Sequence, residues 1–197
     1  EDAVLRAIGR RHTAGEIETT MELVEKYGFP HVNMDLIAGL PEDTEAGFRR
    51  SLERCLDFGT DNITVHTLAL KKGSRILLEG LAVPGAEEVS GMLDFAEKTL
   101  RGAGYGPYYL YRQKYMSGSF ENIGWTRPGG VCWYNVYIMS ELCSILSFGA
   151  GGSTKMVVPG TNRIQRVFNL KYPKEYTERP EKALANLEAF ASFYEHL

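Results

Sequence analysis

The sequence lacks a long apolar run, a basic cluster and a group of closely spaced cysteines, and each absence excludes a class of protein. No apolar stretch approaches the ~20 residues that a membrane-spanning helix needs. The 197 residues carry a formal net charge of −3 with acids and bases interspersed, so we expect no surface suited to nucleic acid or to a membrane. Cys55, Cys132 and Cys143 are too sparse for a disulfide framework, which is typical of the reducing cytoplasm.

The start of the chain does not have the form of a targeting segment. Residues Glu1 to Val4 lack the basic start of a signal peptide and are not followed by its apolar centre. No initiator methionine precedes them, and the chain opens directly in a helical pattern. We therefore expect the chain to be a fragment of a longer protein.

A strand–helix–strand pattern occupies the first third of the chain. Thr13 and Glu16 have the spacing of a capping box, which predicts the start of a helix. The connections between the later elements are short, so the two strands should be parallel with a right-handed crossover. The predicted elements are the end of a helix over 2–9, a helix over 13–28, a strand over 32–38, a helix over 44–59 and a strand over 62–70.

The character of the sequence changes near Gly104, which predicts a boundary between residues 1–104 and 105–197. An amphipathic helix precedes it, and aromatic, strand-like segments follow it. These later elements are a helix over 86–103, strands over 108–113, 131–139 and 143–148, a hairpin of 154–158 with 163–169, and a helix from Pro180 to the end.

The run from Val32 to Pro41 contains one acid, Asp35, within a buried parallel strand. Asn33, Asp35 and Ile37 share one face of this strand, because successive side chains alternate. In α/β sheets ligands bind at the carboxyl ends of strands, which makes Asp35 a candidate for ligand contact. An Asp that only caps the following turn is the alternative, and spacing alone does not separate the two.

Two later segments each allow two interpretations. Tyr105, Tyr108, Tyr109, Tyr111 and Tyr115 surround Arg112, and this group can line a pocket for a flat, acidic ligand or pack an aromatic sheet face on a core. The glycines from 149 to 152 lack both nucleotide-binding fingerprints. They allow either a close approach of the backbone to a ligand or a simple tight turn.

Several motifs resemble the oxygen-independent coproporphyrinogen III oxidase family of radical S-adenosylmethionine enzymes. DLIAGLP over 35–41 is similar to the fifth strand of the family's barrel, AIGRRHT over 7–13 to the segment upstream, and NITVHTLA over 62–69 to the sixth strand. PYYLYRQK over 107–114, ENIG over 121–124 and LSFGAGG over 146–152 resemble the HemZ-like branch, the coproporphyrinogen dehydrogenases. The resemblance implies an α/β fold: the C-terminal part of a partial (β/α)6 TIM-like barrel, followed by a smaller α+β domain.

The resemblance also implies a chemistry and a set of residues. The family uses a [4Fe-4S] cluster and S-adenosylmethionine to make a radical that converts propionates of a porphyrinogen into vinyl groups, in haem biosynthesis. Arg10 matches the residue that pairs with the cofactor carboxylate, and Asp35 the acid that binds the ribose hydroxyls. Ile37 and Ala69 match positions that contact the adenine. Residues expected at the substrate are Tyr109, Arg112, Gly149 and Gly151.

The sequence departs from the family in one respect: it contains no CxxxCxxC motif. Cluster ligands and catalytic residues are therefore not expected within these residues, and we expect the chain alone to be inactive. A haem-binding carrier without dehydrogenase activity is the alternative function, and an α/β interaction module without chemistry is a third. A partial barrel would expose strand edges, through which the chain could self-associate.

Overall fold

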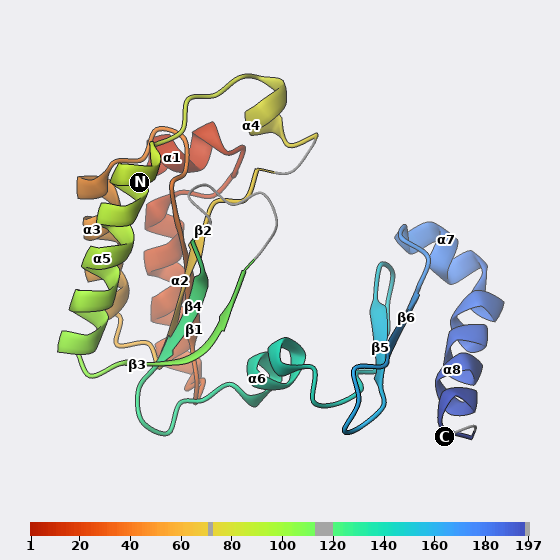
Figure 1. Ribbon diagram of the computed structural model, residues 1–197. Coiled ribbons are helices and arrows are strands. Elements are labelled where there is room, and N and C mark those ends of the chain that lie inside the picture. The colour runs from red at the N-terminus through yellow and green to blue at the C-terminus, as the bar shows by residue number, and fades with distance from the viewer. Residues whose placement is uncertain (71–72, 113–119, 196–197) are drawn as a thin grey trace. The chain divides into compact units, whose positions relative to one another are not determined.

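The computed structural model describes residues 1–70, 73–112 and 120–195 and separates into two compact units, Glu1–Cys132 and Trp133–Leu197 (Figure 1). No helix among the described residues has both the length and the apolar character to cross a membrane. The first unit contains α1 (Asp2–Ala7), α2 (Ala14–Tyr27), β1 (Asn33–Ala38), α3 (Glu45–Asp57), β2 (Asn62–Thr67), α4 (Arg75–Leu78), α5 (Ala86–Gly102), β3 (Gly106–Tyr111) and β4 (Asn122–Thr126).

A four-stranded sheet in the order β1-β2-β4-β3 is the centre of the first unit. β1 and β2 are parallel, which confirms the predicted strand–helix–strand arrangement, whereas β4 is antiparallel to both β2 and β3. Because β4 lies between β2 and β3, the later strands belong to the same sheet as the earlier ones. The boundary placed at residues 104/105 therefore falls inside this compact unit, which continues to Cys132.

Local capping signals set the starts of two helices, as predicted. The Thr13 hydroxyl accepts a hydrogen bond from the backbone N–H of Glu16, and the Glu16 side chain accepts one from the Thr13 backbone N–H, at the start of α2. Thr44 caps α3 in the same way, by accepting from the N–H of Gly47 at 3.1 Å. Gly28 ends α2 in the left-handed conformation that glycine adopts without strain.

The hydrophobic core of the first unit lies between the sheet and the helices α3 and α5, which pack against each other on one side of it (Figure 1). Ile63 and Val65 of β2 and Trp125 of β4 point into this core and are almost fully buried. Their alternation with polar residues leaves the opposite face of the same strands polar. β1 and β3 form the two edges of the sheet.

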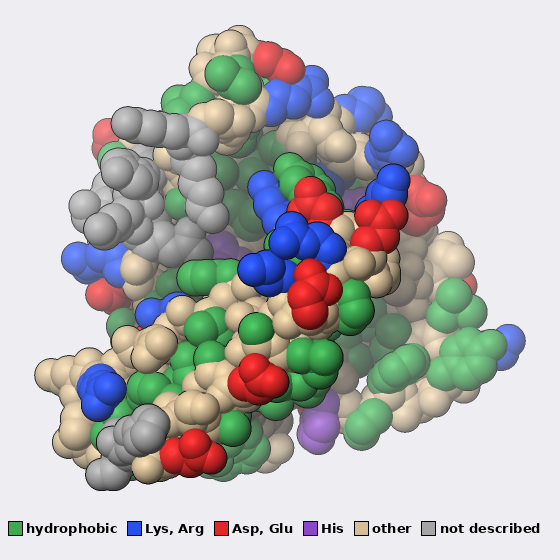
Figure 2. All heavy atoms as spheres, turned by 90° about the vertical axis from the view of Figure 1, so that its right-hand side faces the viewer, with side chains coloured by type: hydrophobic (Ala, Val, Ile, Leu, Met, Phe, Trp, Pro, Cys, Tyr) green, Lys and Arg blue, Asp and Glu red, His purple; other side chains and the backbone are tan. Residues whose placement is uncertain are grey.

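The second unit is built on a hairpin and a long helix, and both confirm the sequence-based prediction. β5 and β6 pair antiparallel from Ser153↔Phe168 to Val157↔Ile164. Its elements are α6 (Trp133–Ser140), β5 (Ser153–Val157), β6 (Ile164–Phe168), α7 (Pro173–Glu178) and α8 (Pro180–Glu195). The unit exposes large apolar side chains: Trp133, Tyr134, Leu142, Phe148, Phe168 and Leu184. Hydrophobic side chains also make up part of the molecular face drawn in Figure 2.

Two predicted strands were wrong. Residues 131–139 contain the helix α6, in which Trp133 and Tyr137 stack one turn apart with ring centroids 6.0 Å from each other. Residues 143–148 form no strand but a single bridge, between Ile145 and Lys155. Residues 131–139 are rich in aromatic and β-branched residues, whose strand preference depends on packing against neighbouring strands, whereas residues 143–148 pair with β5 at Ile145 alone. The elements α4, β4 and α7 were not predicted.

Candidate functional site

The polar face of the first sheet carries side chains from β1, β2 and β3. Met34 and Leu36 of β1 pack against the core, so Asn33, Asp35 and Ile37 share the opposite face, as the alternation predicted. The other strands add hydrogen-bonding side chains to this face: Thr64, His66, Tyr109 and Tyr111.

A cavity of about 970 Å³ in the first unit brings together the four residues predicted to bind S-adenosylmethionine. Arg10 reaches it from the turn after α1, Asp35 and Ile37 from β1, and Ala69 from the segment after β2. Gly9 has a φ of 75°, a backbone conformation that favours glycine, and it reverses the chain just before Arg10. The lining of this one cavity thus includes residues up to 59 positions apart in the chain, from 10 to 69, together with residues of the core face such as Met34 and Phe48.

Asp35 is an ionised acid whose charge is favoured by neighbours on β1 and β2: His66, Asn33 and Thr64. The Asn33 side-chain amide donates to Asp35 Oδ1 at 2.8 Å, and His66 Nε2 lies 3.7 Å from the same oxygen. Its pKa lies below the ordinary value of an aspartate, because His66 and then Asn33 favour the charged form more than partial burial disfavours it. Oδ2 takes part in neither contact, and 60% of the side chain is exposed, so Asp35 can accept hydrogen bonds from a ligand.

Two paths lead from tyrosines of β3 to Asp35, one made of hydrogen bonds throughout and one that ends in the 3.7 Å contact between His66 and Asp35. On one path the Tyr109 hydroxyl lies 3.2 Å from Thr64 Oγ1, which donates to Asn33 Oδ1 at 3.2 Å. On the other path the Tyr111 hydroxyl lies 3.2 Å from His66 Nδ1. The sequence analysis identified Tyr109 as a site residue, but it connected neither Tyr109 nor His66 to Asp35. The only available signal was the polar alternation of β2, at 64 and 66.

The residues expected at the substrate are divided between the two units. Tyr109 is engaged with Thr64, and Arg112 pairs with Glu121 at 3.1 Å across the β3–β4 hairpin. Gly149 and Gly151 belong to the second unit and have φ values of 88° and 74°. Residues 113–115, which belong to the aromatic group seen in the sequence, lie outside the described residues.

The glycine segment of the second unit forms the tight turn that was one of its two interpretations. Gly152 donates its backbone N–H to the Gly149 carbonyl at 3.2 Å, and Gly151 donates to the Leu170 carbonyl at 2.8 Å. The Asn169 amide donates to the Gly149 carbonyl at 3.0 Å. The backbone of this turn is therefore used largely for contacts within its own unit.

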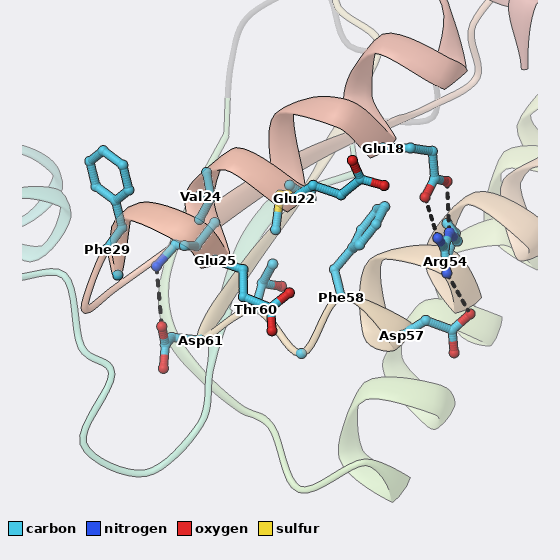
Figure 3. A pocket seen from close by; sticks show the side chains of 14 residues that line it. Glu18, Glu22, Val24, Glu25, Phe29, Arg54, Asp57, Phe58, Thr60 and Asp61 are labelled. Atoms are coloured by element: carbon cyan, nitrogen blue, oxygen red, sulfur yellow. Dashed lines mark hydrogen bonds and ion pairs between the residues drawn. The ribbon is translucent and has the colours of Figure 1, made fainter.

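A second hollow in the first unit, of about 650 Å³, contains none of the predicted site residues. It lies between α2 and the end of α3, where Glu18 and Asp57 point toward Arg54 from either side (Figure 3). The Val32 backbone N–H donates to Asp61 at 3.1 Å at its far end. These acids have partners within the fold, so we attribute to them a role in structure.

A metal cluster does not fit the residues that the structure describes. Within residues 1–70, 73–112 and 120–195 no three histidine, cysteine or acidic side chains are placed to hold a metal ion. The three thiols are free, and burial raises the pKa of Cys55 to about 11, which disfavours the thiolate that a metal requires. S-adenosylmethionine does fit the cavity, since an open carboxylate, a guanidinium and apolar side chains match its diol, its carboxylate and its base.

Comparison with known proteins identifies the fold and then the family that the chain resembles. The structure matches coproporphyrinogen III oxidase HemN from Escherichia coli, a radical SAM enzyme, with a TM-score of 0.63 and 17% sequence identity. The match covers 92% of this chain and 41% of that one, which confirms the predicted α/β fold. No family model matches the sequence.

In sequence the chain is similar to the oxygen-independent coproporphyrinogen-III oxidase-like protein HemZ of Bacillus subtilis, at 40% identity over 183 residues. That alignment covers 92% of this chain and 36% of HemZ. The heme chaperone HemW of Mycobacterium tuberculosis is 26% identical over 182 residues, 89% of this chain and 41% of its own length. The chain thus spans well under half of these relatives, and its resemblance to the HemZ-like branch is confirmed.

Proposed function

We propose that this chain forms one wall of an S-adenosylmethionine site in a radical SAM enzyme that converts propionates of coproporphyrinogen into vinyl groups. The observation that carries the proposal is the cavity in which Arg10, Asp35, Ile37 and Ala69 converge. The similarity to HemZ and HemN supports the reaction class, because HemN is a coproporphyrinogen III oxidase and HemZ is coproporphyrinogen-III oxidase-like. A porphyrinogen is accordingly the proposed substrate, and the cytoplasm the proposed location.

Each cavity residue has a definite task in this proposal. Asp35, ionised and partly exposed, accepts hydrogen bonds from the ribose hydroxyls. The Arg10 guanidinium pairs with the cofactor carboxylate, for which its planar fork is suited. Ile37 and Ala69 provide apolar contact for the adenine. When bound beside a reduced cluster, the cofactor supplies the radical that begins the oxidation.

The cluster requires cysteines from outside these 197 residues, since the three present are neither spaced nor placed to bind it. The chain alone is therefore proposed to be inactive. Iron content and formation of 5′-deoxyadenosine, measured on the 197-residue chain, test this directly. Turnover by the chain alone would contradict the proposal.

The proposed substrate contacts remain Arg112, Gly149 and Gly151, whereas the hydroxyl of Tyr109, the fourth residue expected there, contacts Thr64. Arg112 is the candidate for a substrate propionate, because its present partner Glu121 is an exposed carboxylate that a second carboxylate can replace. Self-association is proposed through β1, whose outer edge has no partner strand among the described residues.

Asp35→Ala tests the cofactor site. In the whole protein we expect the affinity for S-adenosylmethionine, measured by calorimetry, to fall by about 1–3 kcal/mol, the value of hydrogen bonds to a charged group. Asp94→Ala is the matched control, because Asp94 is an exposed aspartate on α5 that does not line the cavity. Equal affinities of the wild type and Asp35→Ala would count against the site.

A haem carrier is the second candidate function, because the heme chaperone HemW is also a relative. Titration of the whole protein with haem separates the two. Tight one-to-one binding of haem without decarboxylation of coproporphyrinogen would favour the carrier, whereas decarboxylation would establish the enzyme.

A further inference from the structure

Four residues, one from each strand, are paired in a single row across the sheet. The register pairs Asp35 with Thr64, Thr64 with Gly124, and Gly124 with Tyr109. Asp35, Thr64 and Tyr109 carry polar side chains on the polar face of the sheet, and Gly124, the third position in the row, carries no side chain. The glycine therefore separates Tyr109 from Thr64 by the width of a strand.

Gly124 is the residue that allows Tyr109 to cross this strand. A Cβ atom built on Gly124 would lie 1.9 Å from Tyr109 Cε1, so the tyrosine ring occupies the space that any side chain here would need. The ladder between β3 and β4 shifts its register between Pro107 and Tyr109, next to this contact. With its ring over the glycine, Tyr109 places its hydroxyl 3.2 Å from Thr64 Oγ1.

The hydrogen bonds along this row run in one direction, toward the carboxylate. Asn33 gives an amide proton to Asp35 at 2.8 Å, and Thr64 gives its hydroxyl proton to Asn33 Oδ1 at 3.2 Å. A threonine hydroxyl has only one proton, so Tyr109 must be the donor in its contact with Thr64. Each donor polarises the next, and the chain ends on the one anion among the four groups.

A second support reaches the same oxygen from Tyr111 through His66. The rings of Tyr109 and Tyr111 lie parallel, with centroids 6.3 Å apart, so the two tyrosines hold each other in place. Both paths end at Asp35 Oδ1. These contacts at Oδ1 restrict the rotation of the carboxylate, and the exposed part of the Asp35 side chain, 60% of it, is available to a ligand.

We propose that Tyr109 is a positioning residue, which orients Asp35 toward the cis-diol of its ligand through Thr64 and Asn33, and that Gly124 is required for this role. The inference rests on the proposed binding of the ribose by Asp35. It differs from the direct substrate contact first expected of Tyr109, because the phenol proton is already committed to Thr64.

The test compares two ligands, S-adenosylhomocysteine and its 2′-deoxy counterpart, in binding to the whole protein. The quantity measured is the ratio of their dissociation constants, which reports the contact with the 2′-hydroxyl. We expect the wild type to prefer the hydroxylated ligand about tenfold, as one hydrogen bond to a carboxylate predicts. Tyr109→Phe, which keeps the ring and removes only the hydroxyl, should lower the ratio to about threefold.

Gly124→Ala should lower the ratio further, toward one, because the methyl group displaces the whole ring. Gly106→Ala is the matched control: Gly106 also lies in the sheet, on β3, but a Cβ there meets no atom within 4 Å. Its ratio should equal that of the wild type. If Gly124→Ala does not fold, Tyr109→Phe still tests the positioning role of Tyr109.

The outcomes separate the two proposals. A wild-type ratio near one would overturn the ribose contact of Asp35 and, with it, the role of Tyr109. A wild-type ratio near tenfold that persists in Tyr109→Phe would overturn the positioning role alone. An equal loss of affinity for both ligands, with the ratio unchanged, would show that the variants act on general stability and would also overturn it.

Discussion

The two faces of the first sheet are made by the same strands and yet differ in every physical respect. The face under α3 and α5 carries Ile63, Val65 and Trp125, none of which is more than 3% exposed. The opposite face carries Asp35 and His66, which are partly open to solvent and joined to neighbours by hydrogen bonds. Because successive side chains of a strand point to opposite faces, the residues that stabilise the fold lie on one face and those available to a ligand lie on the other.

The difference is one of energy as well as of position. Burial of apolar area contributes roughly 25 cal/mol per Å², so the core face supplies much of the stability of this unit. A hydrogen bond on the polar face replaces one that water would make and contributes only about 0.5–1.5 kcal/mol net. Substitutions on the core face should therefore change the free energy of unfolding, and those on the polar face should mainly change binding.

The largest effect is expected from Trp125→Ala on the core face. The indole is 2% exposed and lies under the guanidinium of Arg101, 5.3 Å from the ring centroid. Its removal should lower the free energy of unfolding by about 3–5 kcal/mol, measured with denaturant. Tyr109→Phe, on the opposite face, should lower it by only about 1 kcal/mol. If Trp125→Ala and Tyr109→Phe lowered the free energy of unfolding by similar amounts, the two faces would not differ in their contribution to stability.

A smaller effect is expected where a helix covers the core. Thr44 caps α3, whose Phe48, Leu52 and Cys55 are buried, so Thr44→Ala should reduce the global free energy of unfolding by about 1 kcal/mol. Thr13 caps α2, in which no residue is fully buried. Thr13→Ala should therefore increase hydrogen exchange within α2 and leave the global denaturation midpoint nearly unchanged. A global loss in Thr13→Ala would show that α2 is more strongly coupled to the core than its burial indicates.

The sequence was informative where the determinants of structure are local. The caps at Thr13 and Thr44 and the alternation around Asp35 depend on residues a few positions apart, and all three were predicted. The helix α6 was mistaken for a strand because its aromatic and β-branched residues favour either structure, and only the available partners decide.

The site could be predicted only in part, for the same reason. The strand pattern made Asp35 a candidate and put Ile37 on the same face, whereas the roles of Ile37, Arg10 and Ala69 came from the family resemblance. The support from Tyr109 and Tyr111 depends on the strand order β1-β2-β4-β3, which brings residues about 75 positions apart in the chain, such as 35 and 109, into one row. Gly124 carries no signal in isolation, because its importance lies in the ring that covers it.

The smallest effect, and the finest test of the comparison, is the titration of two aspartates in the first unit. The pKa of Asp35 is lowered, with His66 as the foremost cause, whereas burial raises the pKa of Asp43. An aspartate with a lowered pKa contributes stability above its unfolded pKa, about 4, and that contribution is lost as the pH falls through its folded pKa. The contribution of Asp43 to stability has the opposite sign, because folding favours its protonated form.

Carboxyl carbon NMR should therefore show Asp43 protonating at a higher pH than Asp35. His66→Leu should raise the pKa of Asp35 and leave the pKa of Asp43 unchanged. If Asp35 and Asp43 titrate at the same pH, the polar face does not favour the charged form of Asp35. The proposal that this face keeps Asp35 ionised for a ligand would then be contradicted.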